Sequence, residues 1–212
     1  LLLMIQPDIG QTLLVFLSWV ILVFISGISV PIILTLFSFL LLFLIYIVFF
    51  ISKFAYIKNR ILSFFSPSDG THNFQSDKAI DAINSGGYFG KGIGEGTLKN
   101  RVPEAHTDYI ISVISEEFGV VAIVLLLILF LSFIYTVFKR IYLEKSEKVK
   151  LVLTGATCLI IFQAMIHIGV NIRLFPTTGM TLPFLSYGGS SIISVSILSG
   201  IILNLTKRKV RI

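Results

Sequence analysis

The longest charge-free stretch of this chain runs from residue 9 to residue 52, between Asp8 and Lys53. A helix that crosses a bilayer needs about 20 apolar residues, so this stretch of 44 residues is long enough for two crossings. Gly27 and Pro31 interrupt it near the middle, where they would break a helix. We therefore predict two membrane spans joined by a short turn.

Three further uncharged runs follow. We predict spans at Phe118–Phe138, Leu151–Ile172 and Ser190–Thr206. The composition agrees, because 55% of the residues are hydrophobic, only 13% are charged and the mean hydropathy is +0.94. These values are typical of membrane proteins. The sequence therefore predicts an all-α, polytopic transmembrane bundle of about five spans, with two spans in residues 1–52, a long loop at 53–108 and three spans in residues 109–206.

Lysine and arginine predict the orientation of the bundle, because cytoplasmic loops of membrane proteins are enriched in them. The connection at 139–150 carries five basic residues and the tail at 207–212 carries four. We predict that both are cytoplasmic, so that the loops at 53–108 and 173–189 are extracytoplasmic. The net charge of +6 then reflects this bias, and we expect no nucleic acid partner.

The long loop contains a glycine-rich segment, Asp81–Gly96. It is not a phosphate-binding GxxxxGK[ST] loop, because Ser85 stands at its first glycine position and Gly92 follows Lys91. Two interpretations remain. The glycines can supply positive φ angles and close packing in a tight turn-rich or re-entrant loop, or Lys91 and backbone N–H groups can contact a lipid pyrophosphate.

Titratable residues gather ahead of the third span, in the segment Pro103–Gly119. They are Glu104, His106, Asp108, Glu116 and Glu117. Pro103 suits a first helical turn, which would put Glu104 and Asp108 one turn apart. Asp108 would then lie about 15 Å before Phe118, at the outer interface. It could act as a general base or cap a helix.

A second polar region surrounds the end of the fourth span. Gln163, His167 and Asn171 recur at every fourth residue, and the proline- and glycine-containing segment 173–189 follows. Such side chains usually bind a neighbouring helix, although His167 could also relay protons. Irregular backbone at this depth needs protein or water around it. Asp8, at the start of the first span, is expected to be a helix cap.

Four motifs in this order carry a resemblance: QPDIGQT, SGGYFGKGIGEG, PEAHTDYIISVISEEFG and LFPTTGMTLPFLSYGGSS. They resemble the SEDS family (shape, elongation, division and sporulation), which includes FtsW, RodA and SpoVE, and they extend from residue 6 to about residue 191. AHTD and MTLPFLSYGGSS are more similar to FtsW than to RodA. The family fold has ten spans, so the resemblance implies that these residues are its C-terminal half and incomplete as an enzyme.

The resemblance also implies roles for particular residues. Asp108 matches the essential aspartate of the family and is the expected catalytic residue. Thr178 stands where FtsW proteins commonly have lysine. The expected binding or supporting residues are Glu104, His106, Lys91, Arg173, Thr178, Ser186, Gly188 and Gly189. The cofactor is unknown, with a divalent cation such as magnesium or manganese as one candidate.

The implied activity is that of a peptidoglycan glycosyltransferase, which polymerises lipid II into glycan strands during septal cell-wall synthesis. The implied place is the bacterial inner membrane at the division septum, with the active face outside. The implied partners are lipid II, a class B penicillin-binding transpeptidase and other membrane proteins of the division complex. A lipid II flippase and a non-catalytic division scaffold are the alternatives.

Overall fold

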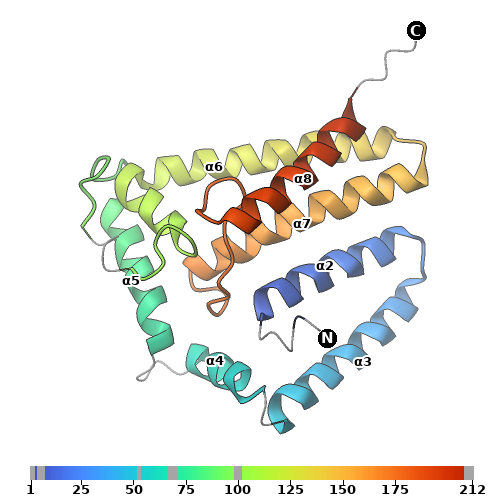
Figure 1. Ribbon diagram of the computed structural model, residues 1–212, viewed down its shortest axis with the longest axis horizontal. Coiled ribbons are helices and arrows are strands. Elements are labelled where there is room, and N and C mark those ends of the chain that lie inside the picture. The colour runs from blue at the N-terminus through green and yellow to red at the C-terminus, as the bar shows by residue number, and fades with distance from the viewer. Residues whose placement is uncertain (1–2, 4–7, 52–53, 66–70, 98–101, 208–212) are drawn as a thin grey trace.

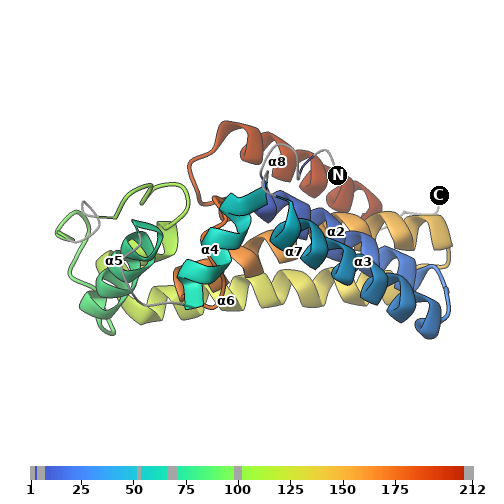
Figure 2. The same ribbon diagram turned by 90° about the horizontal axis from the view of Figure 1, so that it is seen from below.

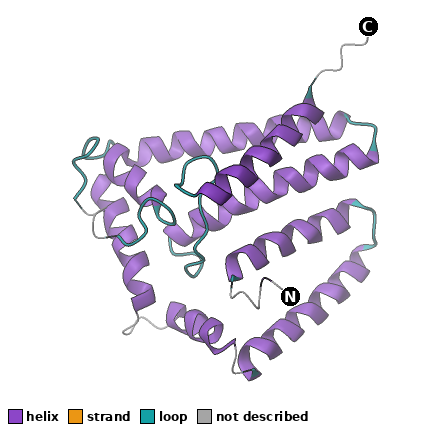
Figure 3. Ribbon diagram, in the orientation of Figure 1, coloured by secondary structure: helices purple, strands orange, loops and turns teal. Residues whose placement is uncertain are grey.

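The computed structural model describes residue 3 and residues 8–51, 54–65, 71–97 and 102–207. These residues form helices joined by turns and loops, and no strand occurs among them (Figure 3). The helices, labelled as in Figure 1, are α2 (Ile9–Ile25), α3 (Val30–Phe50), α4 (Ala55–Phe65), α5 (Thr71–Gly86), α6 (Ile110–Leu143), α7 (Glu147–Asn171) and α8 (Gly189–Thr206). The prediction of an all-α chain is confirmed.

Five helices coincide with the five predicted spans. Helices α3, α6, α7 and α8 are long and apolar enough to cross a membrane, and α2 is a shorter apolar helix. The turn between α2 and α3 lies where Gly27 and Pro31 predicted a break. Asp8 is the N-cap of α2, as expected, since its Oδ1 accepts a hydrogen bond of 2.9 Å from Gln11 N.

The apolar helices form a bundle in which α7 is central. Helix α7 packs against α2, α6 and α8; α6 and α7 run alongside one another, and α8 crosses them at an angle (Figures 1 and 2). The α2–α3 turn, the α6–α7 connection and the end of α8 lie at one end of the bundle. Helices α4 and α5 and the segment after α7 lie at the other end. The basic connection and the end of α8 thus share one end, while residues 208–212 of the tail lie outside the described residues.

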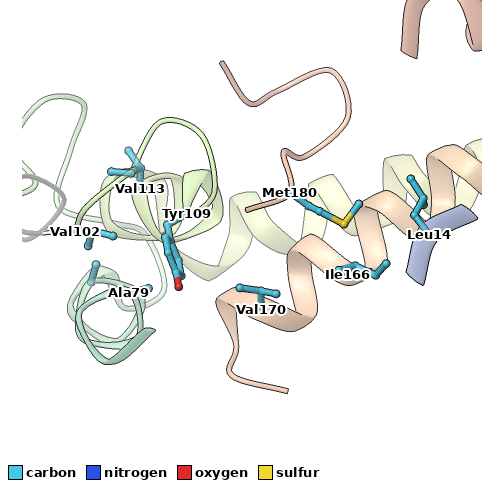
Figure 4. Packing of buried hydrophobic residues seen from close by; sticks show 10 residues of the cluster. Leu14, Ala79, Val102, Tyr109, Val113, Ile166, Val170 and Met180 are labelled. Carbon is cyan, nitrogen blue, oxygen red and sulfur yellow. The ribbon is translucent and has the colours of Figure 1, made fainter. Parts of the chain in front are cut away.

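Among the described residues, three clusters of buried residues hold the bundle together, and the smallest joins α6, α7 and the following loop through Ile111, Leu126, Ala164 and Leu182. The other two lie toward opposite ends of the bundle. One joins α6, α7 and α8 toward the end that carries the basic connection, and its buried members are Val137, Leu153, Ala156, Ile160 and Ile202. The other, shown in Figure 4, joins α2, α5, α7 and the start of α6, with Tyr109 between Ala79 and Val170. Most apolar side chains of α3, α6 and α8 are exposed, as expected for helices that face lipid.

The segment at 53–108, predicted as a long loop, includes helices. It contains α4 and α5, and α5 includes the first six residues of the glycine-rich segment, Asp81–Gly86. Four glycines in the rest of that segment have positive φ angles, as predicted: Gly87 (58°), Gly90 (78°), Gly92 (111°) and Gly94 (82°).

The glycine-rich loop, residues 87–97, is bound to a break in α6. Gly119 has φ 76° and ψ −176°, so residues 110–118 form a separate helical piece that meets the long part of α6 at an angle. At this break, backbone amides of the loop donate hydrogen bonds to carbonyls of α6, and amides of α6 donate to carbonyls of the loop. Lys91 N and Gly92 N donate to the carbonyls of Glu116 and Glu117, at 2.9 and 3.1 Å. Val120 N and Val121 N donate to those of Gly87 and Tyr88, at 3.0 and 3.2 Å.

The segment at 103–109 differs from the prediction. Pro103 does not begin a helix, because Glu104 has a positive φ of 55° and α6 begins at Ile110. Glu104 O nevertheless accepts a hydrogen bond of 3.0 Å from Asp108 N, which makes a single isolated turn between them. The four-residue spacing of Glu104 and Asp108 predicted this turn correctly. It did not predict that the turn is separate from helix α6.

Two alanine substitutions separate backbone conformation from close packing in the glycine-rich loop. Gly90 and Gly94 have nearly equal φ angles, 78° and 82°. A Cβ on Gly90 would meet the carbonyl of Glu117, whereas a Cβ on Gly94 would meet nothing within 4 Å. We expect Gly94→Ala to cost about 1–2 kcal/mol and Gly90→Ala to cost clearly more. Thermal unfolding in detergent measures both, and equal losses would contradict this packing.

Candidate functional site at the end of the bundle

The polar residues of α7 form the base of the site. Gln163, His167 and Asn171 are all buried. Gln163 Nε2 donates to Thr181 O at 2.9 Å and to Ser191 Oγ of α8 at 3.1 Å. His167 Nδ1 lies 2.7 Å from Met180 O. The prediction that this stripe binds a neighbouring helix thus holds for Gln163 and Ser191 of α8, while its other partners outside α7 lie in the loop after α7 and in the Asp108 turn.

That loop, residues 172–188, folds back over α7. Arg173, Gly179 and Phe184 have φ angles of 59°, 68° and 69°. This left-handed conformation is unfavourable for Arg173 and Phe184, because each carries a Cβ. Leu174 N donates to Gly169 O at 2.7 Å, which turns the chain sharply. Ser186 Oγ accepts from Leu182 N at 2.8 Å. Local hydrogen bonds thus stabilise an irregular backbone beside the bundle.

The loop holds the turn that contains Asp108. Three consecutive carbonyls, those of His106, Thr107 and Asp108, each accept a hydrogen bond. The donors are Tyr187 N at 3.0 Å, Ser186 Oγ at 2.7 Å and Asn171 Nδ2 at 3.0 Å. We call this set the carbonyl clamp. Because the clamp fixes the main chain on both sides of Asp108, it restricts where the carboxylate can lie.

The Asp108 side chain is half-buried against the loop after α7. A Cβ placed on Gly179 would lie 3.7 Å from Asp108 Oδ2. Gly179 has a positive φ, which disfavours any residue with a side chain at this position. The space beside Asp108 Oδ2 on this side is therefore not occupied by a side chain from residue 179.

Two other predicted site residues lie on the same turn. Glu104 is exposed, and its Oε2 accepts a hydrogen bond of 2.9 Å from Thr107 Oγ1. His106 is exposed, and only its carbonyl takes part in the clamp.

The two predicted cations each form an ion pair. Lys91 Nζ lies 3.5 Å from Oε1 of Glu116, whose side chain is fully buried. Arg173 Nη1 lies 2.6 Å from Asp77 Oδ1 of α5, and its side chain is one-third exposed. The sequence did not single out Asp77, and it gave Glu116 no role of its own. A Cβ on Gly96 would lie 2.8 Å from Glu116 Cδ, so a larger residue at position 96 would collide with this buried side chain.

The remaining predicted residues have different surroundings. Thr178 packs against α2, where a Cβ on Gly10 would lie 3.0 Å from its Cβ, and its buried Oγ1 has no hydrogen-bond partner among the described residues. Gly188 is the N-cap of α8, with φ −176°, and a Cβ there would lie 3.1 Å from Thr181 Cγ2. Gly189 begins α8 with open space around it. Ser186 is the predicted residue whose contact with the Asp108 turn is most direct.

Within the described residues, no group of three or more histidine, cysteine, aspartate or glutamate side chains could hold a metal ion. Magnesium is usually held by one or two carboxylates together with water and substrate phosphates.

The whole chain matches a protein family. The family model described as "Cell cycle protein", which covers FtsW, RodA and SpoVE, matches residues 1–211.

The chain belongs to this family.

Its relatives in the FtsW/RodA/SpoVE family include two proteins named probable peptidoglycan glycosyltransferase FtsW. The one from Caulobacter vibrioides is 37% identical over 98% of this chain and 52% of its own length. The one from Hydrogenovibrio crunogenus is 40% identical over 65% of this chain and 37% of its own. The chain thus spans about half the length of the first of these relatives. The resemblance seen in the four motifs is confirmed.

A solved structure supports the same membership. A chain in a peptidoglycan synthase complex that coordinates polymerization and crosslinking matches with a TM-score of 0.73 and 29% identity. The match covers 97% of this chain and 56% of that one. Family membership and the apolar helices together make this a multi-pass membrane protein.

Removing one donor tests the carbonyl clamp. Ser186→Ala deletes the hydroxyl that serves both Thr107 O and Leu182 N. Each buried group left without a partner costs about 1–3 kcal/mol, so we expect amide hydrogen exchange at residues 104–110 to rise by about tenfold or more. Ser196→Ala, at an exposed position of α8, is the matched control. Unchanged exchange in Ser186→Ala would show that the clamp does not hold this turn.

Proposed function

We propose that this chain forms part of a peptidoglycan glycosyltransferase that polymerises lipid II, with Asp108 at its centre. The observation that carries the proposal is the carbonyl clamp, which presents the Asp108 carboxylate, half-buried, at the end of an apolar bundle. The names of the FtsW relatives support the reaction. The fold of a chain in a peptidoglycan synthase complex supports it as well.

In the proposed reaction, the C4 hydroxyl of the N-acetylglucosamine in lipid II attacks the anomeric carbon of the growing strand. The hydroxyl proton passes to Asp108, and a new C–O bond forms with inversion. The bond between the anomeric carbon and the pyrophosphate breaks, and its electron pair leaves with undecaprenyl pyrophosphate. A carboxylate that takes this proton in the transition state contributes about 10²–10⁴-fold to the rate.

The leaving pyrophosphate needs positive charge, and we assign Arg173 to it. Arg173 follows Asn171, which binds Asp108 O, by two residues. Its guanidinium carries five N–H donors, of which the contact with Asp77 uses one. Lys91 is the second candidate and would have to leave Glu116 to bind phosphate. Glu104 and His106 would orient the acceptor sugar from the exposed face of the turn.

We propose that the end of the bundle that carries the site faces away from the cytoplasm. The basic connection at 139–150 lies at the other end, where the positive-inside rule puts it in the cytoplasm. The place is then the bacterial inner membrane at the division septum. The partners are lipid II, a class B penicillin-binding transpeptidase and other membrane proteins of the division complex.

A lipid II flippase and a passive scaffold fit less well. A flippase needs a polar path through the bilayer, and in the half of the bundle near the basic connection α6, α7 and α8 pack together through the apolar cluster around Val137, Leu153 and Ile202. The buried polar stripe of α7 ends at the site. A scaffold needs no clamped carboxylate.

The first test replaces Asp108. It uses the longest natural polypeptide that carries these residues, with its transpeptidase partner, and labelled lipid II in detergent. We expect Asp108→Asn to lower strand formation by about 10²–10⁴-fold. Asp81→Asn, an exposed aspartate of α5, should leave it unchanged. Both variants must be inserted equally. Full polymerisation by Asp108→Asn would refute the proposal, and lipid II transfer across vesicles without any polymer would favour the flippase.

The second test separates two roles of Arg173. If the arginine only tethers the loop to α5, then Arg173→Gln and Asp77→Asn remove the same ion pair and should reduce polymerisation equally. We expect Arg173→Gln to slow it by about tenfold or more, since one charge-assisted hydrogen bond contributes about 1.5–3 kcal/mol, and Asp77→Asn to have little effect. Equal losses would restrict Arg173 to the structural role.

A further inference from the structure

Three large apolar side chains project from the glycine-rich loop. The exposed fractions of Tyr88, Phe89 and Ile93 are 78%, 84% and 79%. Exposed apolar groups gathered in one short loop mark a surface that contacts a membrane or another molecule. The site proposed above uses none of the three.

The position of the loop relative to α6 is fixed, because backbone hydrogen bonds join the two. Gly87 O and Tyr88 O accept hydrogen bonds from Val120 N and Val121 N, the first amides of the long part of α6. Tyr88 therefore lies level with Val121. Figures 1 and 2 both show the loop beside this end of α6.

The long part of α6 gives the depth of the loop in a bilayer. Its uncharged run, residues 120–138, has 19 residues and is about 29 Å long as a helix, which is close to the hydrocarbon thickness. Lys139 and Arg140 follow at the far end. Val120 and Val121 thus lie at the edge of the hydrocarbon, and so does the loop bound to them.

The long part of α6 also has an exposed apolar face. Val121, Leu125 and Ile128 are 51%, 58% and 58% exposed and recur at helical spacing on one face. Tyrosine and tryptophan are enriched at this level of membrane proteins, where their rings reach the acyl chains and their polar groups reach the headgroups, and phenylalanine is common on the apolar side of interfacial segments.

We propose that the glycine-rich loop is an interfacial membrane anchor, in which Tyr88, Phe89 and Ile93 insert into the boundary between lipid headgroups and acyl chains. The occupant of this surface is phospholipid. The hydrogen bonds at the break in α6 keep the loop at this depth. The anchor does not depend on the proposed glycosyl transfer, and it would hold the piece of α6 that precedes Gly119 at a fixed height above the bilayer.

Spin labelling measures the depth directly. A nitroxide at Phe89→Cys, in a Cys158→Ala background and in phosphatidylcholine–phosphatidylglycerol vesicles, should be more accessible to oxygen than to a water-soluble nickel chelate. Leu125→Cys serves as the hydrocarbon control and Glu95→Cys, on the same loop, as the aqueous one. We expect Phe89→Cys to fall between the two controls.

Two results would overturn the anchor. Accessibility to nickel equal to that at Glu95→Cys would place the loop in water. Low accessibility to both reagents would mean that protein covers it. Should the label disturb the loop, Tyr88→Trp in a Trp19→Phe background replaces it. Its fluorescence should be quenched by lipids brominated near the top of the acyl chain, and absence of quenching would also overturn the proposal.

Discussion

The position of Asp108 depends on one set of hydrogen bonds, in which the carbonyls of three consecutive residues, 106 to 108, each accept from a donor outside the turn. The donors come from the last residue of α7 and from the loop that returns to α8. In an apolar bundle such bonds are strongly favoured, because a buried carbonyl without a donor costs free energy and water is scarce. The clamp therefore joins two segments that lie 63 or more residues apart in the chain.

The same constraint explains the irregular backbone around the site. A loop at the edge of a membrane is tolerated when protein satisfies its polar groups, and α7 does this with Gln163 and His167, which bind Thr181 and Met180. On the other side of the turn, the break at Gly119 is filled by the glycine-rich loop. A carboxylate on such a frame loses little conformational freedom when substrate binds, which favours catalysis by position.

Hydropathy was sufficient to predict the five apolar helices, because a charge-free run of about 20 apolar residues is long enough to cross the hydrocarbon core as a helix. It could not predict the break in α6, because a single glycine such as Gly119 is common inside membrane helices. The helices α4 and α5 were not predicted, because α5 is polar and α4, although its apolar residues recur at helical spacing, has only 11 residues and is too short to be recognised as a span. Asn171 was visible as the last member of a polar stripe, but nothing in the sequence named Asp108 O as its partner. The spacing of Glu104 and Asp108 predicted one turn correctly and its helical context wrongly.

The most direct test of the account is the effect of Asn171→Ala on catalysis. This substitution removes the donor to Asp108 O and leaves every proposed substrate-binding side chain in place. The account predicts that glycan strand formation slows by about tenfold or more, from the loss of one or two buried hydrogen bonds, while lipid II affinity is kept. Asn204→Ala, at an exposed position of α8, should change neither quantity. A normal rate in a correctly inserted Asn171→Ala protein would contradict the claim that the clamp positions Asp108.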